Sequence, residues 1–199
     1  MTNSEPRNKI IILAGMPGAG KGAISKIMKW HPNISYISTG ILFRALDPES
    51  ELGKEIQAIM TEGGLVNDDI VNRMVEPHLV PGNDILLDGY PRSIPQVEWL
   101  LEKTANDFDV FSFLLELDEE TAIRRRDKRI NDYKLLGEEP RKDDTDPTVL
   151  PKRFAEYREK TEPTIEFLRK KLGDNFFLID GRPTLEDVYE TIMKIYARL

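Results

Sequence analysis

The chain has 199 residues, of which 40% are hydrophobic and 32% charged, with a formal net charge of -7 and no cysteine. This acidic balance argues against nonspecific binding to nucleic acid or to an anionic membrane, because both need a basic face. The lack of cysteine excludes disulfides and thiolate zinc sites. The length fits one large domain or one domain with inserted lobes.

The N-terminal segment "MTNSEPRN" is polar and lacks the apolar centre of a signal peptide. No apolar run approaches the roughly 20 residues that a membrane helix needs. We therefore expect a cytoplasmic protein with neither a membrane nor a nucleic acid as its partner.

Five short apolar runs predict strands, at residues 10–13, 34–37, 85–88, 110–117 and 176–179. The clearest are continuous rather than alternating, as expected when helices cover both faces of a parallel sheet. Helical patterns lie between them, and residues 185–196 repeat apolar side chains at helical spacing. The alternation of strands and helices predicts an α/β fold.

The first strand leads into a glycine-rich loop with the sequence "GMPGAGKGA", whose glycines are Gly15, Gly18 and Gly20. Glycines at this spacing let backbone N–H groups turn towards phosphate oxygens, and the following helix N-terminus adds a favourable dipole. Lys21 adds a positive charge for the β and γ phosphates. A glycine turn with a surface lysine is the alternative, but strand, spacing, lysine and helix together favour a phosphate loop.

Two later segments do not fit a minimal sheet with crossover helices. Residues 39–82 carry helical pattern and no convincing strand, which indicates an inserted helical lobe. Residues 130–146 are polar and rich in turn formers, which indicates a mobile flap over a site.

The stretch "ILLDGYPRSIPQ" places Asp88 at the end of a buried strand. In open α/β sheets ligands bind at this carboxyl edge, although a D-G turn can also be purely structural. Asp88 can hold magnesium through water, since this ion keeps several waters and needs few protein carboxylates. A metal could then sit here without a hydroxyl ligand from the glycine loop. Arg92 is placed to bind a phosphate.

Arginines gather in the following segments. "DEETAIRRRDKRI" has the pattern of a charged, solvated helix, but Arg125 and Arg129 are four residues apart and share one helical face. "PRKDD" and "KRF" add Arg141 and Arg153. Phosphoryl transfer needs cations around the moving group, so this concentration in an acidic chain favours that chemistry.

With these features, the sequence resembles the adenylate kinase family over nearly the whole chain. "GMPGAGKG" is similar to its phosphate loop, "STGILFRA" to its nucleoside-monophosphate motif, and "DGYPRSIPQ" to its most specific signature. "RKDD", "KRFAEYREKTEPTIEFL" and "IDGRP" match the flap hinge, long helix and final turn. The resemblance implies an α/β P-loop kinase with a five-stranded parallel sheet covered by helices, a helical lobe for the nucleoside monophosphate (NMP), and a short lid.

The resemblance also implies how the chain is divided and what it binds. The core would comprise residues 1–38, 83–129 and 147–199, the AMP-binding lobe residues 39–82, and the lid residues 130–146. This short lid is similar to the zinc-free form of the family. The partners would be ATP and AMP, the cofactor Mg²⁺, and the protein a monomer.

Site residues are carried over only onto matching positions. ATP would contact Gly18, Ala19, Gly20, Lys21, Gly22, Ala23 and Arg125. AMP would contact Thr39, Arg44, Gly89, Arg92 and Gln96. The catalytic residues would be Lys21, Asp88, Arg92, Arg129, Arg141 and Arg153, with Asp88 holding the metal through water. Thr39 and Gln96 would read the acceptor adenine, and the pyrimidine-monophosphate kinases look different at both positions.

The sequence departs from the family pattern at several positions. Ala23 lacks a hydroxyl expected beside the phosphates, a loss of roughly 10²–10³ in rate at a critical site and little at a supporting one. Ile41 replaces the usual acidic residue, so we expect altered closure of the AMP lobe. Tyr90 stands where phenylalanine is usual. We expect Pro151 to interrupt a helix begun at Pro147, which makes Arg153 the least secure of the carried-over arginines.

The predicted function is the reversible reaction ATP + AMP = 2 ADP with Mg²⁺, by alignment, arginine neutralisation and exclusion of water. No general base is required, because the AMP phosphate is already an ionised nucleophile. One alternative is a kinase for CMP, UMP or a deoxynucleotide. Another is a nucleotide-binding sensor with weakened catalysis, supported by Ala23, Ile41 and Pro151. The choice between ATP and GTP stays open.

Overall fold

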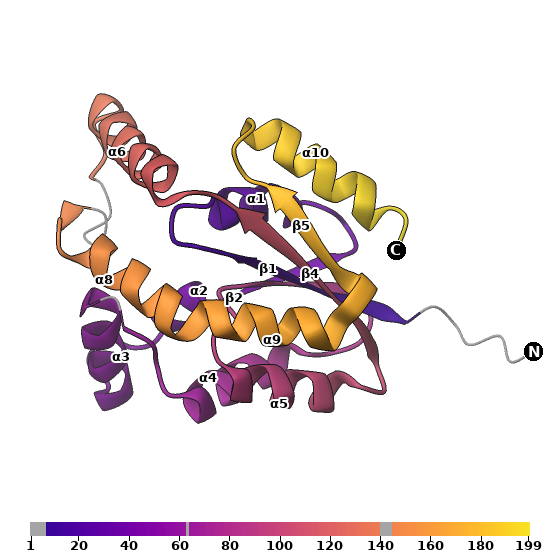
Figure 1. Ribbon diagram of the computed structural model, residues 1–199. Coiled ribbons are helices and arrows are strands. Elements are labelled where there is room, and N and C mark those ends of the chain that lie inside the picture. The colour runs from indigo at the N-terminus through magenta and orange to yellow at the C-terminus, as the bar shows by residue number, and fades with distance from the viewer. Residues whose placement is uncertain (1–6, 63, 140–144) are drawn as a thin grey trace, which may run out of the picture.

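Five parallel strands form one sheet in the order β2-β3-β1-β4-β5 (Figure 1). The computed structural model describes residues 7–62, 64–139 and 145–199. The strands are β1 (Asn8–Gly15), β2 (Ile34–Ser38), β3 (Asp84–Asp88), β4 (Phe108–Glu116) and β5 (Phe176–Asp180). Each overlaps one of the predicted segments, so the five-stranded parallel sheet is confirmed.

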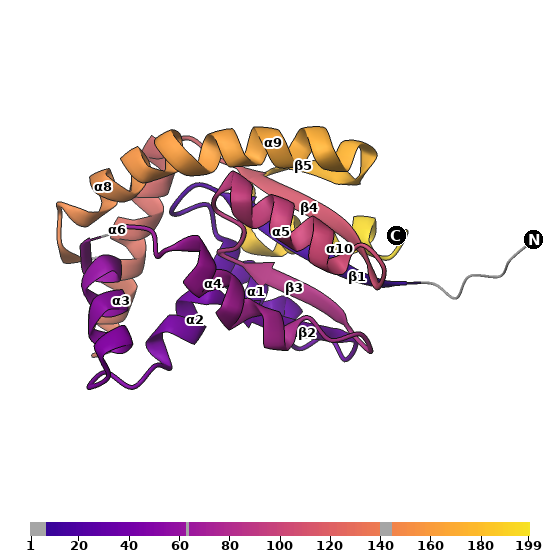
Figure 2. The ribbon, with the colours of Figure 1, turned by 90° about the horizontal axis from the view of Figure 1, so that it is seen from below.

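Helices cover both faces of this sheet (Figures 1 and 2). They are α1 (Lys21–Met28), α2 (Thr39–Arg44), α3 (Glu51–Glu62), α4 (Asp68–Val75), α5 (Ile94–Thr104), α6 (Glu119–Leu135), α8 (Val149–Glu156), α9 (Glu162–Leu172) and α10 (Leu185–Tyr196). The short turns are η1 (Glu76–His78), η2 (Tyr157–Thr161, a π-helical turn) and η3 (Gly173–Asn175). α10 buries Val188 and Ile192, which confirms the predicted amphipathic helix.

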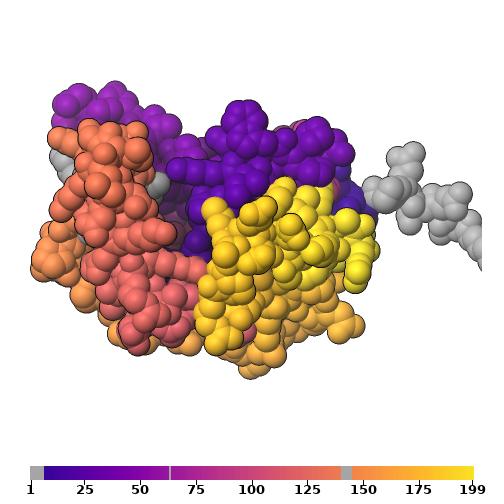
Figure 3. All heavy atoms as spheres, turned by 90° about the horizontal axis from the view of Figure 1, so that it is seen from above, coloured from indigo at the N-terminus to yellow at the C-terminus, as the bar shows by residue number. Residues whose placement is uncertain are grey.

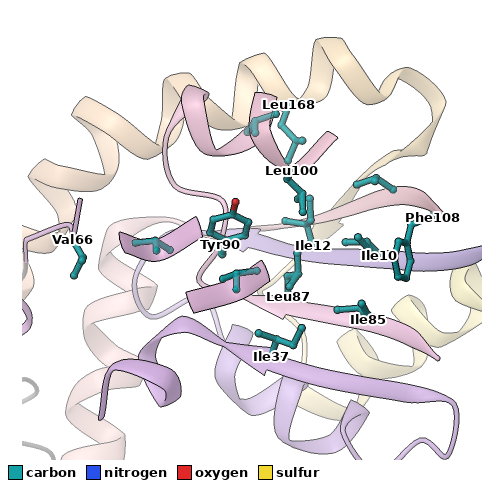
Figure 4. Close-up of a cluster of buried hydrophobic side chains, with 14 of the residues drawn as sticks. Ile10, Ile12, Ile37, Val66, Ile85, Leu87, Tyr90, Leu100, Phe108 and Leu168 are labelled. Carbon is teal, nitrogen blue, oxygen red and sulfur yellow. The ribbon is translucent and has the colours of Figure 1, made fainter. Parts of the chain in front are cut away.

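The central strand β1 is buried on both faces, which explains its continuous apolar run. Ile10 and Ile12 point into a cluster with residues of α5 and α9, part of which Figure 4 shows. Ile11 and Leu13 point into a second cluster with residues of α1 and α10. All four side chains are 2% exposed or less.

The strand register brings three segments of the chain to the same carboxyl edge of the sheet. Leu13 of β1 and Ser38 of β2 both pair with Asp88 of β3. Gly15 ends β1 one strand away from Asp88, opposite Leu115 of β4. The glycine loop, the start of the helical insertion and the Asp88 turn therefore meet at one edge.

The insertion between β2 and β3 contains α2, α3, α4 and η1, and its described residues form no strand (Figure 2). Ile56, Val71 and Val75 of this segment join the cluster that packs on α5. The helical character expected for residues 39–82 is therefore observed.

A buried hydroxyl links this insertion to the rest of the protein. Tyr90 is 2% exposed and follows β3 (Figure 4). Its hydroxyl donates to Asn72 Oδ1 of α4 at 2.7 Å. Burial, and secondarily Asp68, raise the pKa of Tyr90 far above its ordinary value. The extra hydroxyl relative to the usual phenylalanine thus has a buried partner, as buried polar groups require.

The segment predicted as a turn-rich flap begins as helix. α6 continues without a break to Leu135, because no glycine or proline interrupts it before Gly137. Gly137 has φ +70° and closes the helix, with its N–H donating to Lys134 O and that of Glu138 to Tyr133 O. Residues 140–144, including Arg141, lie outside the described residues.

The expectation that Pro151 interrupts a helix is wrong. α8 begins at Val149, after Pro147, so Pro151 falls in its first turn. The backbone N–H of a residue in the first turn has no acceptor within the helix. Proline, which has no backbone N–H, therefore costs the helix no hydrogen bond at this position. Arg153 therefore lies on a regular helix.

Candidate active site

Two adjoining cavities lie at the carboxyl edge of the sheet. The larger is about 570 Å³ and is bounded by the glycine loop, the turn after β3, α6, α8 and the start of α10. Figure 3 shows the hollow between α6, drawn in coral, and the orange-yellow segment that leads into α10. The smaller is about 140 Å³ and lies against α2 and α5. Both are lined by Gly40, Arg44, Leu65, Gly89, Arg92 and Arg153, so arginines mark their boundary.

The glycine loop leaves the N-terminus of α1 open to the larger cavity. Gly20 is the N-cap residue and no side chain caps the helix. Gly18 has φ +86°, and a Cβ there would lie 2.9 Å from Ala122 Cβ of α6. Only glycine therefore lets the loop pack this closely on α6, and the uncapped helix end can accept an anion.

Lys21 is the cation of this loop and lines the larger cavity. Its Nζ donates to two loop carbonyl oxygens, at 2.5 and 3.0 Å. Burial lowers the pKa of Lys21 to about 8, with repulsion from Arg92 and Arg153 adding to this effect and Asp88 opposing it. A phosphate in the cavity would favour the charged form of this lysine.

Asp88 supplies a carboxylate to the same cavity. Its Oδ2 accepts a hydrogen bond from the Tyr36 hydroxyl at 3.0 Å and lies 3.9 Å from where a Cβ on Gly22 would be. Among the residues that the structure describes, no group of three or more His, Cys, Asp or Glu could cage a metal. An oxygen ligand beside a phosphate loop nevertheless suits Mg²⁺, which is usually bound by one or two carboxylates, water and phosphate.

Gly89 brings two predicted AMP-binding residues together. Arg92 Nε and Thr39 Oγ1 both donate to Gly89 O, at 2.8 and 3.1 Å. Gly89 has φ +82°, and a Cβ there would lie 2.8 Å from Thr39 Oγ1 and 3.0 Å from Arg92 Nη2. Only glycine fits this turn, because both the backbone angle and the close approach exclude a side chain.

The smaller cavity is lined by both apolar and polar side chains. Its apolar side chains are Phe43, Met60, Leu65, Val66 and Val71. Thr39 and Gln96 line it as well, and each is 3% exposed. Together with the arginines at its boundary, this mixed lining suits a small ligand that carries both an apolar part and an anionic group.

The arginines of α6 and α8 reach the larger cavity. Arg125, Arg129 and Arg153 line it as the sequence predicts, and so does Arg126, which sequence reasoning missed. Arg125 Nη2 donates to Gly181 O at 2.6 Å, in the turn after β5. The structure therefore brings every predicted site residue to one of the two cavities, apart from Arg141, which it does not describe.

The departures from the family pattern at positions 23, 41 and 90 differ in location. Ala23 lines the larger cavity, so the missing hydroxyl would have stood inside the site. Ile41 is 49% exposed on α2 and lines neither cavity. Tyr90, the third departure, lines the larger cavity as Ala23 does, so positions 23 and 90 alter the wall of the site and position 41 does not.

Positive side chains concentrate where the two cavities meet, beside a loop that can hold phosphates and at the carboxyl edge of a parallel sheet. Phosphoryl transfer needs this arrangement, since its catalysis consists mostly of positioning and charge neutralisation. The fold and the site together define an α/β phosphotransferase of the nucleotide-binding class.

Comparison with known proteins narrows this class to one family. A family model described as adenylate kinase matches residues 13–173. The chain is 36% identical over 194 residues to the adenylate kinase of Agrobacterium fabrum (strain C58), covering 94% of this chain and 97% of that protein. It is 35% identical to those of Bartonella henselae and Brucella melitensis biotype 1, covering 93% of this chain in both comparisons and 98% and 97% of those proteins.

The chain therefore belongs to the adenylate kinase family and is an enzyme of this type. Within the described parts of the chain, no helix combines the length and apolar character that crossing a membrane requires.

Proposed function

We propose that the two cavities hold the two nucleotides of the family reaction, ATP + AMP = 2 ADP, and that the chain catalyses it in both directions. ATP occupies the larger cavity and AMP the smaller. The observation that carries this proposal is that Arg44, Arg92 and Arg153 line both cavities. The phosphoryl group passes between the nucleotides at this boundary, where three guanidinium groups neutralise its charge.

ATP is bound along the glycine loop and α6. The backbone from Gly18 to Ala23 and the uncapped N-terminus of α1 hold its phosphates, with Lys21 between the β and γ groups. Arg125 lies against the adenine, and Arg129 stabilises the transferring group. The same role for Arg141 stays a prediction, because this residue lies outside the described structure.

Mg²⁺ fits the residues at this edge of the sheet. Asp88 would hold it through water, and phosphate oxygens would complete its shell. When bound, the ion neutralises charge on the phosphates. The Tyr36 hydroxyl, which donates to Asp88 at 3.0 Å, orients the carboxylate for this task.

AMP is bound in the smaller cavity, with Arg44 and Arg92 on its phosphate, and Gly89 allows the close approach of Arg92 and Thr39. Thr39 and Gln96 contact the base and favour AMP over the pyrimidine nucleotides. No general base is needed, because the AMP phosphate already carries its charge at neutral pH.

The division into lobes, the monomeric state and the cytoplasmic location are also proposals. Residues 1–38, 83–129 and 147–199 form the core, 39–82 the AMP lobe, and 130–146 the lid, whose closure excludes water. The monomeric state and the cytoplasmic location stay predictions from the sequence. One observation favours a second candidate, a nucleotide-binding sensor with weakened catalysis: Ala23 removes a hydroxyl inside the larger cavity.

Phosphorus NMR with ATP, Mg²⁺ and one acceptor at a time tests the proposed function, with AMP, dAMP, CMP, UMP and GMP as the acceptors. We expect ADP to form fastest with AMP. Faster turnover of another acceptor would reassign the substrate. Nucleotide line broadening without turnover for any acceptor would favour the sensor.

The lowered pKa of Lys21 predicts a pH dependence of ATP binding. The folded protein carries the Lys21 charge below a pKa of about 8 and loses it above. Nucleotide phosphates lose their last proton near pH 6, so they do not titrate in this window. We expect the KM for ATP to be constant below about pH 8 and to rise above it, and initial rates between roughly pH 7 and 9.5 measure this. A KM that stays flat across the window would contradict the role of this lysine.

A further inference from the structure

The side-chain amide of Gln96 is held on both sides by partners of opposite character. Its Oε1 accepts a hydrogen bond from the backbone N–H of Arg92 at 2.7 Å. Its Nε2 donates to Asp68 Oδ1 of α4, also at 2.7 Å. Because Gln96 is 3% exposed, water offers little replacement for either bond.

These two partners permit only one orientation of the amide. A backbone N–H can only donate, and an ionised carboxylate can only accept. Turning the Gln96 amide by 180° would set its NH₂ group against the Arg92 N–H and its oxygen against the Asp68 carboxylate. Both hydrogen bonds would be lost and both contacts would become repulsive.

The fixed amide presents a defined pattern to the smaller cavity, which Gln96 lines. Its oxygen keeps a second lone pair and its nitrogen a second hydrogen, so it can still accept one bond and donate one. A 6-aminopurine matches this pattern, because its amino group donates beside a ring nitrogen that accepts. A 6-oxopurine has an acceptor beside an N–H donor, so both contacts would be mismatched.

We propose that Asp68 is a positioning residue that sets acceptor specificity, holding the Gln96 amide so that the site takes a 6-aminopurine and rejects a 6-oxopurine nucleotide. Asp68 does not line the smaller cavity itself and acts through Gln96. Sites that recognise a ligand by hydrogen bonds reject analogues that leave buried polar groups unpaired. The inference rests on the proposed function in one respect, namely that the smaller cavity holds the acceptor nucleotide.

The position of α4 does not depend on Asp68 alone. Asn67 caps the helix, since its Oδ1 accepts from Asp69 N at 2.9 Å. Asn72 binds the Tyr90 hydroxyl, which anchors α4 to the segment after β3. Changing Asp68 should therefore leave the helix in place, and the exposed neighbour Asp69 provides a matched control on the same helical turn.

Asp68→Asn is the sharpest test, because asparagine has the same shape but can present either an acceptor or a donor to Gln96. AMP and inosine 5′-monophosphate (IMP) are the probes, since they differ at the edge that the amide would read. Calorimetry gives both Kd values without turnover, and ADP formation gives both kcat/KM values. We expect the preference for AMP over IMP to fall about tenfold in Asp68→Asn, the effect of one charge-assisted hydrogen bond, and to be unchanged in Asp69→Asn.

An unchanged ratio of AMP to IMP affinity in folded Asp68→Asn protein would overturn the proposal, and so would an equal loss of affinity for both. Asp68→Ser, which is too short to reach Gln96, should give the same loss of preference and serves if the first variant does not fold. If wild-type protein shows no turnover while the Kd ratio still falls in the variant, the proposed reaction is rejected and the role of Asp68 is supported.

Discussion

Arg92→Ala should lower turnover by about two orders of magnitude or more while leaving the fold intact. The guanidinium lies at the boundary of the two cavities and is positioned by its bond to Gly89 O. Burial, and secondarily repulsion from Arg153, lower the pKa of Arg92, so the site holds two cations close together before any anion binds. That arrangement is unfavourable alone and becomes favourable when a phosphoryl group bridges the cations, which is when catalysis needs it.

Initial rates of ADP formation measure this effect, with a thermal melt as the check on folding. Arg73→Ala is the matched control, because Arg73 is exposed on α4 and lines neither cavity. The turnover of Arg92→Lys should lie between those of Arg92→Ala and the control, since lysine keeps the charge but loses the planar guanidinium group. Activity of Arg92→Ala within a few fold of wild type would show that the boundary is not the place of transfer.

Lys21→Met should lower kcat/KM for ATP by about 10²–10³. Methionine is similar in length, so the loop keeps its packing while the cation is lost. In the structure the Lys21 ammonium binds two carbonyl oxygens of its own loop, and it would exchange them for phosphate oxygens on ATP binding. The loss should therefore appear in transition-state stabilisation rather than in the stability of the fold.

Lys29→Met is the control for this variant, because Lys29 is exposed at the other end of α1 and lines neither cavity. Steady-state kinetics with varied ATP separates the effects on kcat and KM. If Lys21→Met changes only KM for AMP, the larger cavity is not the ATP site and the assignment of the two cavities must be reversed.

The sheet and its edge were predictable because their signals are local. A strand buried on both faces must be apolar throughout, and Ile10 to Leu13 are. Asp88 stands at the end of such a strand, and the carboxyl edge of a parallel sheet is where loops leave room for ligands. Both the glycine loop and Asp88 follow predicted strands, and this was enough to place them at the same edge of the sheet.

Side-chain contacts between distant segments were not predictable from a single sequence. Tyr36 binds Asp88 across 52 positions of the chain, and Asp68 binds Gln96 across 28. Each contact depends on strand register or helix packing, and neither leaves a pattern in the residues around it. Arg126 was missed because a run of charged residues is typical of a solvated helix face. Only the position of α6 in the fold shows that this side chain lines the cavity.

The error at Pro151 has a different origin. Proline breaks a helix only beyond its first turn, so the prediction depended on where the helix starts. Both Pro147 and Val149 are acceptable starts by sequence, and only the structure shows that α8 begins at Val149. That α6 extends to Leu135 was likewise not predictable, because its polar sequence has little of the apolar periodicity that indicates a helix.

The most direct test of two nucleotide sites that exchange a phosphoryl group uses a single nucleotide. Purified protein is given ADP and Mg²⁺ alone and followed by phosphorus NMR. We expect ATP and AMP to appear in equal amounts until equilibrium is reached, because one ADP occupies each cavity and the phosphoryl group crosses between them. ADP that persists unchanged, or that releases inorganic phosphate without forming ATP, would contradict phosphoryl transfer between two nucleotide sites.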